Sequence, residues 1–252
     1  MKTSQKIKQS VVNNLAKTTL YENVTELLRM QQIYEAGIKE VRTKLEILDA
    51  EFKVKHDHNP IHHIESRLKS PESILKKAIS KDIPVTERSL EENIHDIAGI
   101  RVICNYVDDV YKVAQLLTNQ DDIQLIEMKD YIQNPKESGY MSLHLVLEVP
   151  IFLSEGPKPI HVEVQLRTIA MDFWASLEHK IRYKFEGKAP QHINEELKAC
   201  SDIVNMLDAK MLSLNEEVQA LPKVGVEEQH EENVRMQKMW EENKIVDKLQ
   251  KK

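Results

Sequence analysis

Long hydrophobic runs are missing from this 252-residue sequence. No stretch approaches the run of about 20 apolar residues that a membrane-spanning helix needs, and the basic N-terminus lacks the apolar segment of a signal peptide. Cysteine is scarce, and Cys104 and Cys200 both lie in apolar periodic segments, where a buried thiol is expected rather than a disulfide or a metal ligand. These absences predict a cytoplasmic protein that is neither secreted nor embedded in a membrane.

A strong excess of one charge sign is also missing. The 35 Lys and Arg residues face 41 Asp and Glu residues, which gives a net charge of −6. Such a balance argues against a general nucleic-acid binder, although it allows a local basic cleft that accepts phosphates. The hydrophobic fraction of 41% is sufficient for one sizeable core with helical extensions.

Helical periodicity is present toward both ends of the chain. From about residue 21 to 55, apolar residues recur at spacings of four and three, which predicts a long amphipathic helix. The following segment, HDHNPIHH, predicts a turn, and Ser70 then predicts the N-cap of a second helix that runs to about Lys81. A four-three seam from Ile193 to Val218 predicts another helix, which packs either within the chain or against another copy. The charged remainder from about Pro222 predicts a loosely held helical tail.

The middle of the chain carries the strand signals. An apolar, β-branched segment from Ile97 to Val107 predicts a buried strand, followed by a helix that Asp108 or Asp109 caps. A weaker strand is expected near residues 123–128. Segments 141–150 and 159–168 alternate strictly, which predicts an antiparallel pair with one apolar and one polar face. The fold class is therefore α+β, with a mixed sheet flanked by helices.

The start of the second helix carries a cluster of cations. Arg67, Lys69, Ser73 and Lys77 lie around it, where free backbone N–H groups and the helix dipole favour an anion. Phosphates would bind well at this position. A solvated basic face explains the same residues equally well.

Asp96 immediately precedes the apolar strand, and Arg101 lies within it, between two apolar neighbours. A carboxylate and a guanidinium beside a buried strand are costly to desolvate unless they are paired or used. A structural ion pair between them is the plain alternative.

The polar face of the last strand is the most informative feature. Glu163 and Gln165 are neighbours on it, and His144 is expected across on the preceding strand. The preceding loop brings Lys136 and Tyr140 to the same face, where an aromatic ring can stack on a base and a cation can bind its phosphates. Exposure of this face to solvent is the default alternative for an antiparallel sheet.

Four histidines form a further cluster, and their spacing could hold a transition metal. They are His56, His58, His62 and His63. The cluster is polar, adjoins a proline turn and has no cysteine partner, so a surface turn is favoured over a metal site.

Four ordered motifs then point to a family. They are R-x-K-x-x-x-S-x-x-x-K at Arg67–Lys77, D-I-A-G-I-R at Asp96–Arg101, K-E-S-G-Y-x-S-x-H at Lys136–His144, and E-V-Q-L-R-T-x-A-M-D-F-W-A at Glu163–Ala175. Together they closely resemble the synthetase domain of the RelA/SpoT homologues, and the chain looks like a stand-alone small alarmone synthetase. The residues before Arg67 are too few for the hydrolase domain of the long relatives, so hydrolysis is not expected.

The resemblance implies a nucleotidyltransferase-like sheet of about five strands and a reaction that moves pyrophosphate from ATP to GDP or GTP, with GMP as a further possible acceptor. It implies that Arg67 and Arg101 enclose the adenine and that Lys69, Ser73 and Lys77 hold the phosphates of ATP. Mg²⁺ would be bound by Asp96 and Glu163, and Glu163 would also be the catalytic base. The guanine nucleotide would be bound by Lys129, Lys136, Tyr140, His144, Gln165 and Asp172.

The resemblance also implies an organisation and an assembly. It places the catalytic core at residues 56–188, between a helical arm at 1–55 and helices with a charged tail at 189–252. The stand-alone branch of the family suggests a homo-oligomer, specifically a tetramer. Two alternatives stay open: another kind of nucleotidyltransferase, and a catalytically silent regulator that only binds nucleotides.

Overall fold

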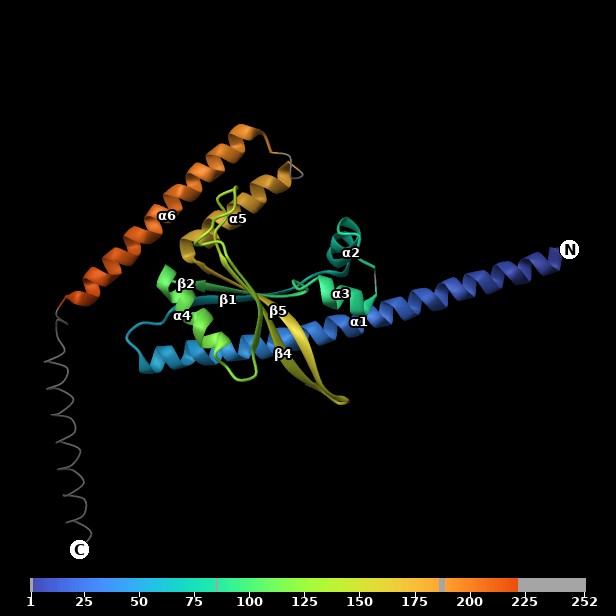
Figure 1. The fold of residues 1–252 in the computed structure, drawn as a ribbon. Helices are drawn as coiled ribbons and strands as arrows, with labels where there is room; N and C mark the ends of the chain where they lie inside the picture. The colour runs from blue at the N-terminus through green and yellow to red at the C-terminus, as the bar shows by residue number, and fades with distance from the viewer. Residues whose placement is uncertain (1, 85, 186–188, 222–252) are drawn as a thin grey trace, which may run out of the picture. The chain divides into compact units, whose positions relative to one another are not determined.

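The computed structural model describes residues 2–84, 86–185 and 189–221, and it arranges them as six helices and five strands (Figure 1). The helices are α1 (Lys2–Lys55), α2 (Pro71–Ser80), α3 (Glu87–Asn93), α4 (Val107–Thr118), α5 (Ile169–Lys184) and α6 (Gln191–Ala220). The strands are β1 (Ile61–Leu68), β2 (Ala98–Cys104), β3 (Gln124–Asp130), β4 (Leu143–Leu153) and β5 (Gly156–Thr168). The charged tail expected from Pro222 lies outside the described residues.

The five strands form one mixed sheet in the order β1-β2-β5-β4-β3. Strands β2 and β5 pair in parallel, whereas the other three pairings are antiparallel. A parallel pair needs a crossover connection, and the chain between β2 and β5 supplies it through α4, β3 and β4. The predicted fold class, a mixed sheet with flanking helices, is confirmed, as is the antiparallel pairing of the two alternating segments.

One face of the sheet and helix α1 form the main core. The alternation in β4 and β5 buries Leu145 and Val164 on this face, where each is at most 1% exposed. They belong to the same apolar cluster as Val41 of α1. A Cβ atom at Gly37 would lie 2.9 Å from Cγ2 of Ile160, so the missing side chain lets α1 approach β5 closely.

Helix ends follow the sequence signals in two of three cases. The hydroxyl of Ser70 accepts a hydrogen bond from the backbone N–H of Ser73 at 3.3 Å, and Pro71 begins α2. Thr168 likewise caps α5. The third prediction, that Asp108 or Asp109 caps α4, is met only in part: the N-cap residue is Tyr106, but Oδ2 of Asp109 accepts a hydrogen bond from the backbone N–H of Tyr106 at 3.2 Å.

Three segments differ from the sequence-based expectation. Helix α1 begins at Lys2 rather than near residue 21, since no glycine or proline interrupts residues 2–36. The predicted turn after it contains the start of β1, which is stabilised as a strand by pairing with β2. Helix α3 was not expected, and Thr86 caps it.

Helix α6 is confirmed, but its buried face is only partly the predicted seam. Leu197 and Val204 are buried as expected, together with the polar residues Ser201 and Asp208. Leu207, from the same seam, is 52% exposed. The chain divides into two compact units, residues 1–210 and 211–252. The sheet lies in the first unit, and the second is described only as far as residue 221.

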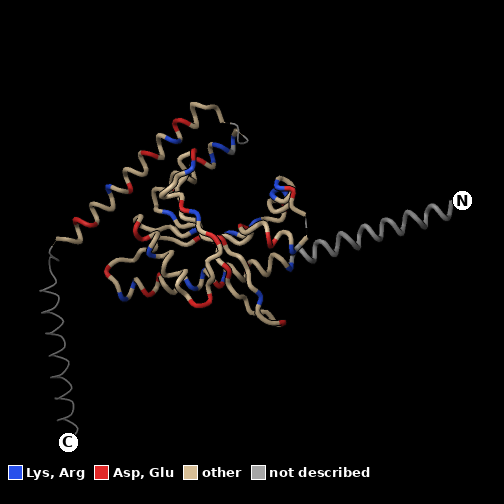
Figure 2. Tube along the Cα trace, in the orientation of Figure 1, with Lys and Arg blue, Asp and Glu red and all other residues tan. Residues whose placement is uncertain are grey.

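The cysteines and the charges complete the description. Cys104 is buried, as predicted, whereas Cys200 is exposed because it lies on the outer side of α6. Burial raises the pKa of the Cys104 thiol. Charges of both signs are spread over the described elements (Figure 2). Among the described residues, no helix combines the length and the apolar content that crossing a bilayer requires.

Candidate active site on the polar face of the sheet

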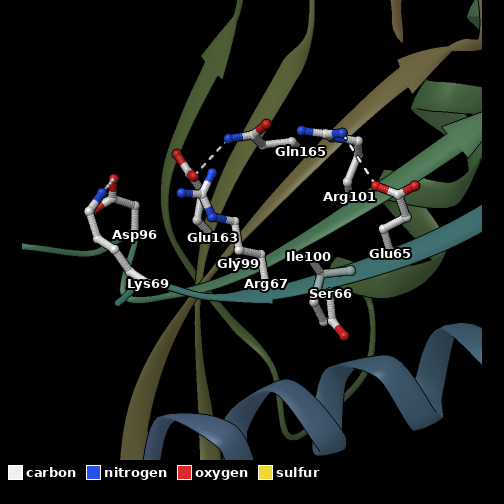
Figure 3. A pocket seen from close by; sticks show the side chains of 10 residues that line it. All are labelled: Glu65, Ser66, Arg67, Lys69, Asp96, Gly99, Ile100, Arg101, Glu163 and Gln165. Carbon is white, nitrogen blue, oxygen red and sulfur yellow. Dashed lines mark hydrogen bonds and ion pairs between the residues drawn. The ribbon is translucent and has the colours of Figure 1, made fainter. Parts of the chain in front are cut away.

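Cross-strand pairing gathers polar side chains on the sheet face opposite α1 (Figure 3). Residues directly opposite one another on neighbouring strands share a face. One row across the sheet consists of Glu65, Arg101, Gln165, His144 and Lys129. The adjacent row contains Arg67, Gly99 and Glu163. The strand register therefore brings residues from all four sequence motifs onto one face of the sheet.

A cavity of about 400 Å³ opens on this face. Its lining includes Arg67, Lys69, Asp96, Gly99, Arg101, Glu163 and Gln165. Gly99 lies between Arg67 and Glu163 in the cross-strand row. A Cβ atom there would find only the backbone oxygen of Arg67 within 4 Å, so the glycine leaves open space at the centre of the site.

Asp96 is held by two lysines. Its Oδ2 atom lies 2.7 Å from Nζ of Lys69 and 2.8 Å from Nζ of Lys77. Burial alone would raise the pKa of Asp96, but the hydrogen bonds and charges of the two lysines outweigh burial and lower it. Among the described residues, the buried Oδ1 atom has no hydrogen-bond partner. One carboxylate oxygen is thus neutralised, and the other is left for a further ligand.

The ion pair considered between Asp96 and Arg101 is not formed. Instead, Nη1 of Arg101 lies 3.3 Å from Oε2 of Glu65 and 3.5 Å from Oδ1 of Asp172. Arg67 and Arg101 occupy adjacent cross-strand rows of the same face. The hydroxyl of Ser73, another predicted site residue, lies 2.9 Å from that of Ser70.

Glu163 stands at the centre of a hydrogen-bonded group. Its Oε1 lies 3.3 Å from Nδ1 of His144, and its Oε2 accepts from the amide nitrogen of Gln165 at 2.9 Å. Burial raises the pKa of Glu163, and the nearby charge of Asp96 raises it further, but His144 and Gln165 lower it more. The carboxylate is therefore ionised at neutral pH and can accept a proton.

An aromatic cluster continues the site beyond His144. The hydroxyl of Tyr140 lies 2.9 Å from Nε2 of His144. The ammonium of Lys136 lies 4.9 Å from the ring centroid of Tyr140 and 4.4 Å from that of Tyr131. The proximity predicted for Lys136, Tyr140 and His144 is confirmed. Lys129, opposite His144, pairs with Glu127 at 2.8 Å.

Sequence reasoning overlooked two residues of this face. Glu65 lines the cavity beside Arg101. Arg167 is 5% exposed and contacts Tyr140, Gln165 and Asp172. Arg167 continues the alternating polar series of β5, so its face was predictable, although its burial was not.

The histidine cluster does not form a metal site. Within the part of the chain that the structure describes, no group of three or more His, Cys, Asp or Glu residues could hold an ion. His58 instead pairs with Asp109 at 2.8 Å. The alternative favoured from sequence, a surface turn, is wrong for His62 and His63, which lie in β1.

Cations and two carboxylates on one open sheet face are typical of enzymes that transfer phosphorus groups between nucleotides. Comparison with known proteins agrees with this class. A family profile described as "Region found in RelA / SpoT proteins" matches residues 66–188. The chain is 44% identical to the GTP pyrophosphokinase YwaC of Bacillus subtilis, over 80% of this chain and 94% of that protein. It is 38% identical to the GTP pyrophosphokinase YjbM of the same organism, over 74% and 87% of the two chains.

Solved structures give the same result. Small alarmone synthetase 1 from Bacillus subtilis, bound to its product pppGpp, superimposes with a TM-score of 0.74 at 36% identity, over 78% of this chain and all of that one. Small alarmone synthetase 2 from the same organism gives 0.68 at 43% identity, over 74% and 96%. The chain belongs to the RelA/SpoT family, among its small synthetases.

Proposed function

We propose that this chain transfers the β,γ-pyrophosphate of ATP to the ribose 3′-hydroxyl of GDP or GTP, releasing AMP and forming (p)ppGpp. The observation that carries the proposal is a single cavity that joins Arg67, Lys69 and Asp96 to Glu163. Both GTP pyrophosphokinases compared above support it. Further support comes from small alarmone synthetase 1, which has been solved with pppGpp and with AMPCPP.

ATP binds at the β1, β2 and α2 side of the cavity. The guanidinium groups of Arg67 and Arg101 enclose the adenine, because delocalised planar cations stack well on aromatic rings. Lys69, Lys77 and Ser73 hold the phosphates close to the N-terminus of α2, whose dipole also favours an anion. Support for this side comes from Lys69 and Lys77, whose ammonium groups already converge on one oxygen of Asp96.

The guanine nucleotide binds at the β4 side. Tyr140 stacks on the guanine and Asp172 binds its edge, whereas Lys136, Lys129 and His144 hold the 5′-phosphates. Gln165 supports Glu163 through the hydrogen bond described above. GMP remains a further candidate acceptor, with fewer phosphates for these cations.

The reaction is a displacement at the β-phosphorus. The 3′-oxygen forms a bond to the β-phosphorus, the bond from that phosphorus to the oxygen bridging it to the α-phosphorus breaks, and AMP leaves with the electron pair. Glu163 accepts the proton of the 3′-hydroxyl. The lysines beside the phosphates stabilise the charge that develops on the transferring group.

The carboxylates suit one Mg²⁺ ion. The unpartnered Oδ1 of Asp96 is a free acceptor among the described residues. Glu163 lies close enough to Asp96 for the charge of Asp96 to act to raise the pKa of Glu163. Mg²⁺ is commonly bound by one or two carboxylates together with substrate phosphates rather than by a full protein cage. When bound, the ion would supply positive charge to the reacting phosphates.

A product assay tests the proposal directly. Purified protein is incubated with Mg²⁺, ATP labelled at the γ-phosphate and each guanine nucleotide, and the products are separated by chromatography. AMP and a guanosine carrying a 3′-pyrophosphate are expected. Free pyrophosphate would indicate a nucleotidyltransferase, and binding without AMP would indicate a silent regulator. Glu163→Gln should abolish synthesis but retain AMPCPP binding, and wild-type turnover would remove Glu163 from its role.

Assembly and location belong to the same proposal. A homo-oligomer, specifically a tetramer, is supported by the apolar residues that α6 leaves exposed, such as Met206 at 73% and Leu207 at 52%. Light scattering coupled to size exclusion measures the mass, and a monomer would contradict the assembly. The proposed substrates are abundant in the cytoplasm, where the enzyme is expected to act.

A further inference from the structure

Arg167 on β5 has no role in the reaction described above, although it is one of the most buried charges of the site. Its Nη2 atom donates to the hydroxyl of Tyr140 at 2.6 Å and to Oε1 of Gln165 at 2.7 Å. Its Nη1 atom donates to Asp172 at 3.2 Å. A buried guanidinium needs partners. All three of these partners are residues to which acceptor binding is assigned.

The first arm of this network runs through Tyr140. Because an arginine only donates hydrogen bonds, the hydroxyl oxygen of Tyr140 must accept from Arg167. That hydroxyl also interacts with Ser142, whose own hydrogen goes to the carbonyl oxygen of Leu166. The proton of the Tyr140 hydroxyl can then be donated to Nε2 of His144, at 2.9 Å. A neutral imidazole that accepts at Nε2 carries its hydrogen on Nδ1. Nδ1 lies 3.3 Å from Oε1 of Glu163, so this arm ends in an N–H donor aimed at the carboxylate.

The second arm runs through Gln165. Since Arg167 only donates, the carbonyl oxygen of the Gln165 amide must face it, and the NH2 group must face the other way. That NH2 group lies 2.9 Å from Oε2 of Glu163. The second arm therefore also ends in an N–H donor, on the other oxygen of the same carboxylate.

We propose that Arg167 is a positioning residue that, together with the ionised and only accepting carboxylate of Glu163, fixes the direction of the hydrogen bonds in this network and so presents one N–H donor to each oxygen of Glu163. The inference rests on the proposed function for the role of Glu163. Two donors hold the carboxylate in one orientation. A carboxylate offers about four lone-pair sites, so two remain for the 3′-hydroxyl and a metal ion. The same contacts hold the ring of Tyr140 in place for the base.

The test reads the tautomer of His144, which does not depend on turnover. Protein labelled with ¹⁵N-histidine is studied by NMR at a pH where imidazole is neutral, and His144→Gln identifies the signal. Arg167→Met removes the donor at similar volume, and Arg167→Lys retains a residue that only donates. Tyr140→Phe removes one oxygen and breaks the first arm alone. Arg182→Met, which removes an ion-paired arginine of α5, is the matched control.

We expect His144 to carry its hydrogen on Nδ1 in the wild type, in Arg167→Lys and in Arg182→Met. In Arg167→Met and Tyr140→Phe the share of His144 with its hydrogen on Nε2 should rise above that of the wild type, because only Glu163 then favours Nδ1. Arg167→Met should also lower kcat by about 10–100-fold while KM for ATP stays unchanged, as expected when a supporting hydrogen bond is lost. Circular dichroism and AMPCPP binding check that each variant is folded.

Two results would overturn the inference: a wild-type hydrogen on Nε2, or an unchanged tautomer in folded Arg167→Met. If Arg167→Met does not fold, an unchanged tautomer of His144 in Tyr140→Phe would overturn the inference instead. A wild-type enzyme that forms no product would refute the proposed function, whereas the tautomer measurement would still decide the direction of the hydrogen bonds.

Discussion

Gly139 offers a sharp test of how α6 holds the loop that precedes β4. The backbone of Gly139 has φ +87°, a conformation that favours glycine, and its carbonyl accepts a hydrogen bond from the hydroxyl of Ser201 at 2.5 Å. A Cβ atom at residue 139 would lie 2.6 Å from Cβ of Ser201 and 3.5 Å from Cα of Lys198. Gly139→Ala therefore combines backbone strain with a steric clash.

The chain offers a matched control for the strain. Gly156 has φ +121°, and a Cβ atom there would meet nothing within 4 Å. Backbone strain of this kind costs about 1–3 kcal/mol, and forcing extra atoms into a packed site costs about 1–3 kcal/mol more. We expect Gly156→Ala to lose only the first amount and Gly139→Ala to lose about 2–6 kcal/mol, the sum of the two ranges.

Urea unfolding followed by circular dichroism measures both variants, with the midpoint and slope compared at equal protein concentration. Adding Ser201→Gly removes the atom that clashes, so the double variant should be less destabilised than the sum of the single ones. KM for the guanine nucleotide should rise in Gly139→Ala, because Lys136 and Tyr140 flank the strained residue. Equal destabilisation of Gly139→Ala and Gly156→Ala would refute the reasoning.

Three further predictions concern single side chains. Burial raises the pKa of Asp208, so the native state binds that proton more tightly and the contribution of Asp208 to wild-type stability should fall as pH rises above the ordinary Asp range. Asp208→Asn should remove that dependence, and melts across acidic to neutral pH that run parallel for both proteins would contradict it. Tyr140→Ala should raise KM for the acceptor by about 5–150-fold, the equivalent of a lost stacking contact of about 1–3 kcal/mol, and steady-state kinetics with an unchanged acceptor KM would disprove stacking. Asp96→Asn should raise the Mg²⁺ concentration needed for half-maximal rate, which a metal titration measures, and an identical curve would exclude Asp96 as a ligand.

The paired strands were predictable because their signal is local. Alternation in β4 and β5 places successive side chains on opposite faces, and Leu145 and Val164 indeed face the core, whereas His144 and Glu163 lie on the polar face. The cap at Thr168 was predictable for the same reason, since a cap depends on residues within one turn.

Other features depend on partners distant in sequence. The start of β1 resembles a polar turn and becomes a strand through pairing with β2, a contact that local pattern does not encode. Arg167 lies on the predicted polar face, but its burial depends on the packing of Tyr140, Gln165 and Asp172 around it. The seam of α6 likewise indicated a helix without revealing that Ser201 and Asp208 share its buried side.

Because the sheet is a single layer, the buried residues of β5 can influence the position of the catalytic side chain on its other face. Val162 and Val164 alternate with Glu163 on one strand, and Val162 lies on the side where Gly37 lets α1 press closely against β5. A change in bulk under the strand would tilt or lift it, and Glu163 would move relative to Asp96. Turnover could thus be adjusted from beneath the strand, by residues that never meet a nucleotide.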